Sequence, residues 1–165
     1  MTARSHLETG RLLLVPLTRS DADAVLSGER QSNWSAGYPA DGDVEIARMI
    51  ANAANDSNGP DLFGPYNVVE RESGLLIGGA GFLGPPDDQG AVEIGYGIAP
   101  EWRNRGLATE AVVGLLAFAW SQPSVERVFA TTDLPNLASA RVLEKAGMSR
   151  VRIDNELVYY ESAGP

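Results

Sequence analysis

The sequence predicts an α/β (α+β) protein in which a mixed, mostly antiparallel sheet is flanked by helices. Two patterns indicate this. In the first half, apolar segments bounded by turn residues fold back as hairpins, and in the second half such segments alternate with helical patterns. The 165 residues, 44% of them hydrophobic and 21% charged, are enough for one domain with a substantial core. Since no repeat, low-complexity tract or linker divides the sequence, we expect residues 1–165 to form a single domain, with residues 1–8 disordered.

The first half is predicted to contain three strands and two helices: in chain order, the strand Arg11–Leu17, the helices Ser20–Glu29 and Asp43–Asn55, and the strands Tyr66–Arg71 and Leu75–Leu83. Acidic residues in the first turn favour the start of the first helix, and Asp43 is expected to be the N-cap of the second. Apolar residues recur with helical spacing from Ile46 to Ala53, which predicts one buried face. Asn33–Gly42 and Asp56–Pro65 are predicted loops.

The second half is predicted to alternate strands with helices: the strand Val92–Ile98, the helix Leu107–Trp120, the strand Val125–Thr132, the helix Asn136–Ala146 and the strands Met148–Ile153 and Leu157–Glu161. In the first of these strands, bulky apolar residues alternate with Glu93, Gly95 and Gly97. One face therefore carries a single carboxylate and two glycines, and a ligand can approach the backbone closely there.

The turn after this strand, Arg103–Thr109, places two arginines and a glycine directly before a helix. Free backbone N–H groups at a helix start attract an anion, and Arg103 and Arg105 add positive charge. The turn is therefore predicted to bind a phosphorylated anion. A carboxylate, an open strand face and this anion site lie close together in the sequence. Their combination indicates an enzyme with a phosphate-bearing cofactor.

Composition argues against several other kinds of chemistry. The chain has no cysteine, so it can form no disulfide, thiolate metal site or cysteine acyl-enzyme. A single histidine argues against a His-cluster metal site and a Ser-His triad, and we expect no metal. The formal net charge of −9 argues against nucleic-acid binding, and no apolar run approaches the ~20 residues that span a membrane. Because the N-terminal residues also lack a signal-peptide pattern, we expect a cytoplasmic protein.

The strand and turn resemble the acetyl-CoA-binding core of the GNAT acetyltransferases. The family's loop pattern, Arg/Gln-x-x-Gly-x-Gly/Ala, is filled here by Arg103, Gly106 and Ala108. A second segment, Asn136-Leu-Ala-Ser-Ala-Arg-Val-Leu-Glu-Lys-Ala-Gly-Met148, resembles the family's Asn-x-x-Ser/Ala…Glu-Lys-x-Gly-Phe segment. The opening Leu7-Glu-Thr-Gly-Arg-Leu-Leu-Leu14 is similar to the first strand of the branch that contains ribosomal-protein N-terminal acetyltransferases.

This resemblance implies a GNAT fold and an N-acetyltransferase. The enzyme would move the acetyl group of acetyl-CoA to a primary amine by direct attack in a ternary complex. The resemblance also implies cofactor contacts along the strand, the turn and the second segment: Tyr96, Gly97, Ile98, Arg103, Asn104, Arg105, Gly106, Leu107, Ala108, Thr109, Asn136 and Ser139. The strand is expected to offer its backbone to the pantetheine amides, with the side chains of Tyr96 and Ile98 in the core. Asn136 is expected to cap its helix as well as contact the cofactor.

Two residues are expected to move protons. Glu93 would take the amine proton, directly or through a water. Many GNAT enzymes carry a tyrosine acid seven residues after the asparagine, where this chain has Leu143. Ser139 is the substitute that resembles the ribosomal-protein branch, and it would protonate the leaving thiolate. A thiol with a pKa of ~8.5 also leaves without an acid, so this step has two alternatives.

The acceptor amine is open at this point. The resemblance places Trp34 and Tyr38 on the acceptor side, where they form either an aromatic wall for an amine or ordinary packing. A protein N-terminus, a ribosomal protein, a small amine or an antibiotic would all fit, as would a homodimer. Two alternative functions also stay open: a non-catalytic acyl-CoA-binding or sensing module, and a transferase of another acyl-CoA such as succinyl- or propionyl-CoA. We expect neither a nucleic-acid nor a membrane partner.

Overall fold

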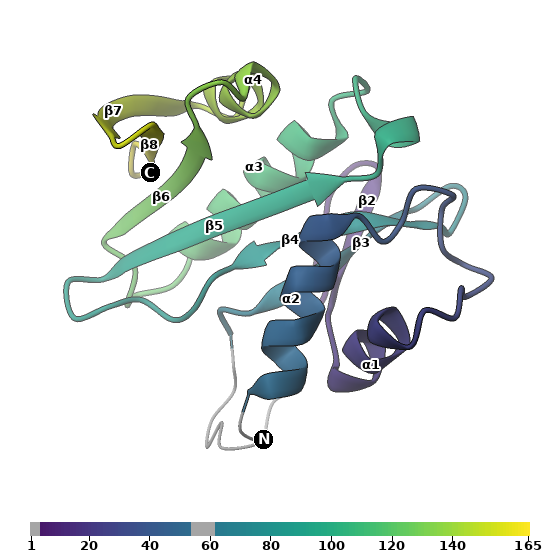
Figure 1. Ribbon diagram of the computed structural model, residues 1–165. Helices are drawn as coiled ribbons and strands as arrows, with labels where there is room; N and C mark the ends of the chain where they lie inside the picture. Colours follow the sequence, from purple (N-terminus) through teal and green to yellow (C-terminus); the bar gives the residue numbers. More distant parts are fainter. Residues whose placement is uncertain (1–3, 54–61) are drawn as a thin grey trace.

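The structure is a computed structural model that describes residues 4–53 and 62–165. Figure 1 shows its elements, which in chain order are β1 (Leu7–Glu8), β2 (Leu12–Pro16), α1 (Arg19–Ser27), α2 (Asp41–Asn52), β3 (Pro65–Glu70), β4 (Leu76–Phe82), β5 (Ala91–Ile98), the short 3-10 helix η1 (Pro100–Trp102), α3 (Leu107–Trp120), β6 (Arg127–Asp133), α4 (Leu137–Lys145), β7 (Met148–Asp154) and β8 (Leu157–Ser162). None of the helices in the described ranges has the length and apolarity needed to cross a bilayer.

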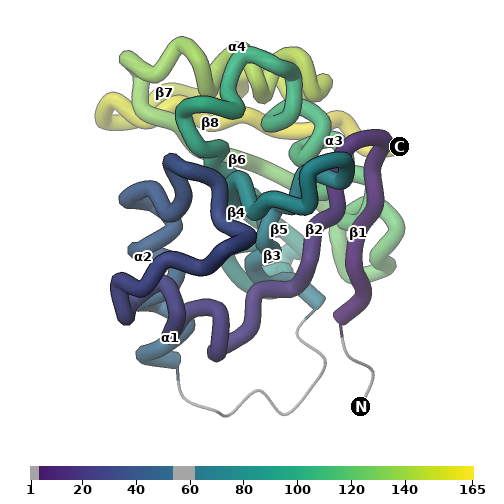
Figure 2. Tube along the Cα trace, turned by 90° about the vertical axis from the view of Figure 1, so that its right-hand side faces the viewer, coloured from purple at the N-terminus to yellow at the C-terminus, as the bar shows by residue number. Residues whose placement is uncertain are grey.

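The strands form one eight-stranded sheet in the order β1-β2-β3-β4-β5-β6-β8-β7. Neighbouring strands are antiparallel except for β5 and β6, which run parallel. Helices α1 and α2 lie over one face of the sheet and α3 lies over the other, with α4 beside it (Figures 1 and 2). The predicted mixed, mostly antiparallel sheet flanked by helices is confirmed.

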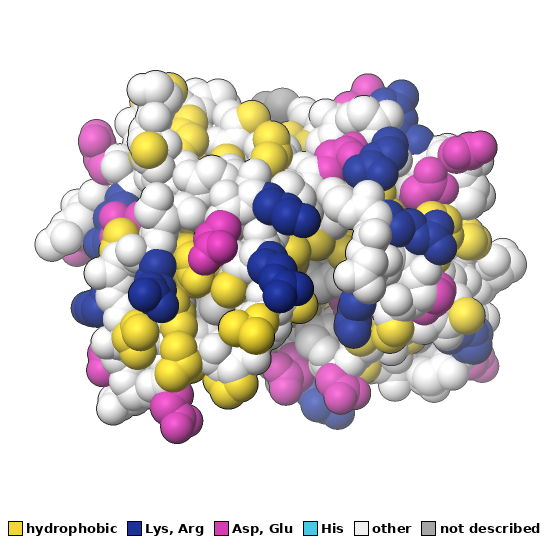
Figure 3. All heavy atoms as spheres, turned by 90° about the horizontal axis from the view of Figure 1, so that it is seen from above, with side chains coloured by type: hydrophobic (Ala, Val, Ile, Leu, Met, Phe, Trp, Pro, Cys, Tyr) yellow, Lys and Arg dark blue, Asp and Glu magenta, His cyan; other side chains and the backbone are white. Residues whose placement is uncertain are grey.

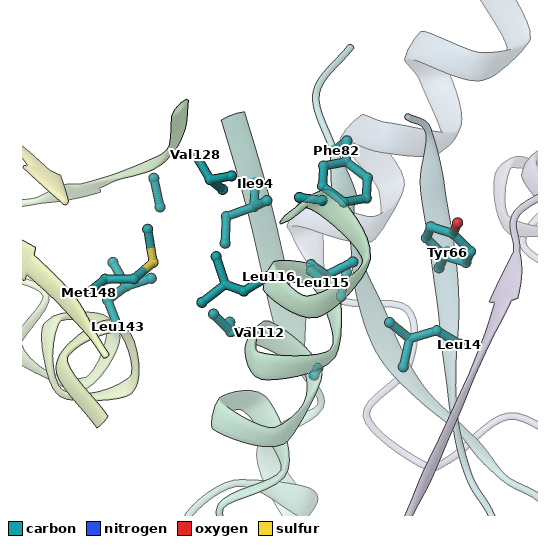
Figure 4. Close-up of a cluster of buried hydrophobic side chains, with 14 of the residues drawn as sticks. Leu14, Tyr66, Phe82, Ile94, Val112, Leu115, Leu116, Val128, Leu143 and Met148 are labelled. Carbon is teal, nitrogen blue, oxygen red and sulfur yellow. The ribbon is translucent and has the colours of Figure 1, made fainter. Parts of the chain in front are cut away.

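The main core fills the space between the sheet and α3. Val112, Leu115 and Leu116 of α3 pack against Ile94 of β5, and Leu143 extends the same cluster to α4 (Figure 4). Burying a large aliphatic side chain contributes roughly 1.5–3 kcal/mol, before the cost of ordering it. This cluster therefore fixes both helices relative to β5, the strand on which the predicted site depends.

The predicted N-cap of α2 is wrong. The cap is Ala40, and the helix begins at Asp41. Asp43 instead lies at the third helical position, where its Oδ2 accepts the Ala40 N–H at 2.9 Å. A carboxylate can accept a free backbone N–H at a helix start either from the N-cap or from the third helical position. An aspartate therefore fits the predicted position and the observed one equally well.

The predictions also differ from the structure at β1 and β6, and by one to three residues at several other helix and strand ends. Residues Leu7–Glu8, expected in the disordered end, form β1 and pair with β2, whereas residues 1–3 lie outside the described part of the chain. The predicted strand start at Val125 is wrong, because its N–H bonds the carbonyl of Gln122 in a turn and β6 begins two residues later. The predicted loop Asp56–Pro65 lies mostly outside the described residues.

Candidate active site

The parallel strands β5 and β6 are paired over only part of their length. Ala91–Glu93 pair with Arg127–Phe129, and no further pair joins the two strands. Beyond Glu93 the strands diverge, β6 rising toward α4 while β5 continues toward η1 (Figure 1). Backbone groups on the diverging edges are thus not used by this ladder and are free to bond an extended ligand.

Glu93 occupies the last paired position before the strands diverge. Its side chain is partly buried, and Oε1 accepts a hydrogen bond from the Thr131 hydroxyl of β6 at 3.0 Å. The strand alternation places this carboxylate on the same face as Gly95 and Gly97, which is the face covered by α2. The sequence did not single out Thr131, because its contact depends on the pairing of β5 with β6.

Glycines on the neighbouring strand complete an area without side chains. In the β4–β5 pair, Gly79 lies opposite Gly97 and Gly81 lies opposite Gly95, and we call these four residues the glycine patch. A Cβ added at Gly97 would meet nothing within 4 Å. The predicted close approach of a ligand to the β5 backbone thus has room at Gly97.

A cavity of about 680 Å³ lies between α2 and the glycine patch. Its described lining includes Asp43, Ile46 and Met49 of α2, Phe82 at the end of β4, and Leu83 directly after it. The same cavity reaches the end of β5 and Arg103, the first residue of the predicted anion-binding turn.

The predicted anion-binding turn has the backbone shape expected of one. Asn104 and Gly106 have φ values of 63° and 77°, and Gly106 is the N-cap of α3. No side chain caps this helix, so the first N–H groups of α3 are available to an anion. Leu107 can contribute only its backbone, because its side chain is buried in the core. Figure 3 looks down on this end of the molecule, where Lys and Arg side chains gather around a hollow.

The two arginines of the turn make contacts inside the protein that stabilise the turn. Arg103 Nε donates to the Ile98 carbonyl at 2.9 Å, and the Arg105 guanidinium stacks over the Trp102 ring with its carbon 4.7 Å from the ring centre. Arg11, which no local sequence pattern marks as a site residue, donates to the Arg105 carbonyl at 2.9 Å. These contacts hold the backbone that would face the anion.

The second predicted segment lies close to β5. Tyr96 Oη lies 2.8 Å from Ser139 Oγ and 3.1 Å from the Ser139 carbonyl oxygen. The Tyr96 side chain, predicted to lie in the core, is only partly buried. Its hydroxyl group contacts Ser139 of α4. Asn136 caps α4, since its Oδ1 accepts the Ser139 N–H at 3.0 Å. Leu143, at the position of the usual tyrosine acid, is fully buried.

The structure does not bring Trp34 and Tyr38 to the cavity. Their rings pack edge to face with centres 5.2 Å apart, and neither is among the described residues that line the cavity. Tyr38 is 2% exposed, and burial together with the nearby Asp43 and Asp21 raises the pKa of its hydroxyl. Packing between α1, α2 and Leu76 explains both rings.

The diverging parallel strands and the turn into an uncapped helix describe a candidate site, and comparison with known proteins identifies the family. A family model described as acetyltransferase (GNAT) domain matches residues 11–149. The chain therefore belongs to the GNAT acetyltransferase family. Within the described residues, no group of three or more His, Cys, Asp or Glu side chains could hold a metal ion.

Relatives are similar along nearly their whole length. The chain is 31% identical to the uncharacterized N-acetyltransferase YjdG of Bacillus subtilis over 147 residues, which cover 86% of this chain and 88% of the relative. A GNAT-family acetyltransferase structure from Bordetella pertussis is 30% identical, with a TM-score of 0.66, and covers 97% of this chain and 100% of its own. The fold is also that of the ribosomal alpha-N-protein acetyltransferase RimL in complex with coenzyme A, with a TM-score of 0.67 at 14% identity over 97% and 98% of the two chains.

Proposed function

We propose that this GNAT acetyltransferase moves the acetyl group of acetyl-CoA to a primary amine by direct attack in a ternary complex. The observation that carries the proposal is the continuity of the site. The glycine patch, the end of β5 and Arg103 line one cavity. Glu93, where β5 and β6 diverge, precedes this part of β5 on the same strand, and the uncapped start of α3 follows Arg103 in the turn. An extended thioester with a pyrophosphate at one end fits such an arrangement.

Each part of the donor has a matching part of the protein. The backbone of Tyr96, Gly97 and Ile98 would bond the pantetheine amides, and an N–H group there would polarise the thioester carbonyl. The turn Arg103–Thr109 would bind the pyrophosphate, since the α3 dipole favours negative charge at its uncapped start. Asn136 would offer its amide nitrogen, because its oxygen is occupied by the Ser139 N–H.

Two side chains would move the protons. Glu93 takes the proton of the attacking nitrogen, directly or through a water, while the C–N bond forms and the C–S bond breaks. Ser139 gives its proton to the departing thiolate. The Tyr96 hydroxyl, 2.8 Å from Ser139 Oγ, can supply a proton to the serine in turn. This pair supports catalysis over a non-catalytic acyl-CoA-binding module, since a hydroxyl donor is present although Leu143 is not one.

A thiol-release assay tests the proposal. Acetyl-CoA is offered with peptides, polyamines, amino acids and aminoglycosides, and with propionyl- and succinyl-CoA as competing donors. The proposal expects amine-dependent thiol release, together with a mass gain of one acetyl group on the amine. Binding of acetyl-CoA without turnover of any amine would instead support the sensing module. The cytoplasmic location and the homodimer remain predictions from the sequence.

A further inference from the structure

The cavity contains a carboxylate that the proposed chemistry does not use. Asp43 lies in the first turn of α2, and a Cβ built at Gly79 would lie 3.1 Å from its Oδ1. The carboxylate therefore stands over the glycine patch, one strand away from Gly97. Its Oδ2 accepts the Ala40 N–H, and no hydrogen bond or ion pair from another described residue reaches Oδ1.

The surroundings of Asp43 are apolar. Ile46 and Met49 line the cavity from α2, and Leu83 lines it from the opposite side. Met49 is 58% exposed and Leu83 is 49% exposed, although both are large hydrophobic residues. Exposed apolar side chains at the mouth of a cavity indicate an apolar ligand, because they otherwise face water at a cost.

The charges of the cavity favour a cation. Of the described lining residues, only Asp43, Glu45 and Arg103 are charged, and Arg103 already bonds the Ile98 carbonyl at the far end. The acidic pair stands on α2. A nitrogen within hydrogen-bond distance of Asp43 Oδ1, about 2.9 Å, would lie over the Gly79–Gly97 pair, where Gly97 leaves open space.

We propose that the cavity binds the acceptor as an apolar primary amine: the ammonium group bonds Asp43 Oδ1, and an alkyl or aromatic group fills the space between α2 and the glycine patch. The inference rests on the proposed function and names its substrate class. Two sources share this chemistry, a small arylalkyl amine and the first residue of a peptide that begins with a large apolar side chain. Polyhydroxylated amines fit poorly, because their hydroxyl groups would lose water without finding partners on these walls.

The test compares four amines in the thiol-release assay: 2-phenylethylamine, a peptide that begins with phenylalanine, the same peptide beginning with serine, and kanamycin. We expect kcat/KM for at least one of the first two to exceed both others by at least ~10-fold. A higher kcat/KM for 2-phenylethylamine would identify a small amine as the acceptor, and a higher kcat/KM for the phenylalanine peptide would identify a peptide N-terminus. Equal or better turnover of kanamycin, or of the serine peptide, would overturn the inference while leaving amine acetylation intact.

Two variants separate the contribution of the Asp43 charge from that of the apolar cavity lining. Asp43→Asn should raise KM for the preferred amine by at least ~10-fold and leave the KM for acetyl-CoA unchanged. Asp41→Asn, on the same turn but exposed, is the matched control and should change neither. Met49→Gln, at an exposed rim position, should narrow the preference for the apolar amine. If Asp43→Asn behaves like Asp41→Asn, the inference is wrong.

Failure of the proposed function looks different. In that case acetyl-CoA raises the melting temperature of the wild type, but no amine releases thiol, neither these four nor the polyamines, amino acids and other amines of the wider panel. The inference then fails with the proposed function, whereas a preference for polar amines removes the inference alone.

Discussion

The hydroxyl oxygen of Tyr96 lies 2.8 Å from the hydroxyl oxygen of Ser139, and this contact joins β5 to the first turn of α4. Burial raises the pKa of Tyr96, although the bond to Ser139 partly opposes that effect. The phenol therefore stays protonated near neutral pH and can donate to the serine. The contact also supplies a hydroxyl pair at a site where Leu143 replaces the usual tyrosine.

The first prediction concerns this hydroxyl pair. Ser139→Ala should lower turnover by ~10- to 100-fold with little change in acetyl-CoA affinity, because it removes a proton donor rather than a binding group. Tyr96→Phe should lower turnover less, by roughly 3- to 10-fold, since Ser139 keeps its own proton. Steady-state kinetics and a CoA analogue with a more acidic thiol provide the measurement. The analogue should restore the turnover of Ser139→Ala more than that of Tyr96→Phe. An equal effect on the turnover of both variants would show that Ser139 binds the cofactor but does not protonate the thiolate.

The second prediction concerns the cap of α4. Asn136→Ala removes the oxygen that accepts the Ser139 N–H and should cost ~1 kcal/mol of unfolding free energy. Acetyl-CoA should also bind more weakly, because the amide nitrogen is lost. Asn136→Asp keeps the cap and loses that nitrogen, so its stability should match wild type while its affinity falls. If Asn136→Asp binds acetyl-CoA normally, the asparagine is a cap and nothing more.

The third prediction tests the anion-binding turn. Gly106 and Gly147 have φ values of 77° and 92°, so alanine at either place should cost roughly 1–2 kcal/mol of stability. Only Gly106→Ala should weaken acetyl-CoA binding as well, because Gly106 is the N-cap of α3 and strain at its left-handed φ would shift the first N–H groups of that helix. Calorimetric titration of both variants with acetyl-CoA measures this difference. Equal affinities in the two folded variants would remove the turn from the site.

The fourth prediction follows from the burial of Asp43. Burial raises the pKa of this carboxyl despite its bond from Ala40, so its ionised form destabilises the folded state at neutral pH. As the pH falls through the raised pKa toward the ordinary value, the folded protein takes up a proton first and this penalty disappears. Asp43→Asn should therefore raise Tm by roughly 2 °C at pH 7, and the gain should shrink on acidification. A loss of stability at pH 7 would show that the carboxylate holds α2 in place.

Patterns within a short stretch of chain could be predicted from the sequence, and contacts between distant strands could not. The run from Val92 to Thr109 shows its strand through alternating apolar residues, and its turn into a helix through Gly106. The glycine patch was not foreseen, because Gly79 faces Gly97 only through the register of β4 on β5. Asp43 was noticed for the wrong reason, as a cap, since its place over that patch depends on how α2 lies across the sheet.

Aromatic residues in loops were the weakest guide to the site. Trp34 and Tyr38 fit an aromatic wall by type, but side-chain chemistry alone does not distinguish a wall from a packed pair. The backbone of their loop is tied down by distant groups, with the Gly37 N–H bonding Glu101 Oε1 at 2.7 Å and the Ser35 N–H bonding the Leu76 carbonyl at 3.0 Å. These long-range bonds, which no local pattern contains, decide which way the rings point.

The central claim is that Glu93 is the base of an amine acetyltransferase, and the pH dependence of kcat/KM for Glu93→Gln tests it most directly. With the best amine of the panel, the variant should lose ~10²-fold or more of its activity and the acidic limb of the pH profile. Acetyl-CoA should still raise its Tm as it does for the wild type, by mass action. Glu29→Gln, which changes an exposed carboxylate after α1, should behave like wild type in both measurements. Turnover equal to wild type at every pH in the Glu93→Gln variant would contradict the account.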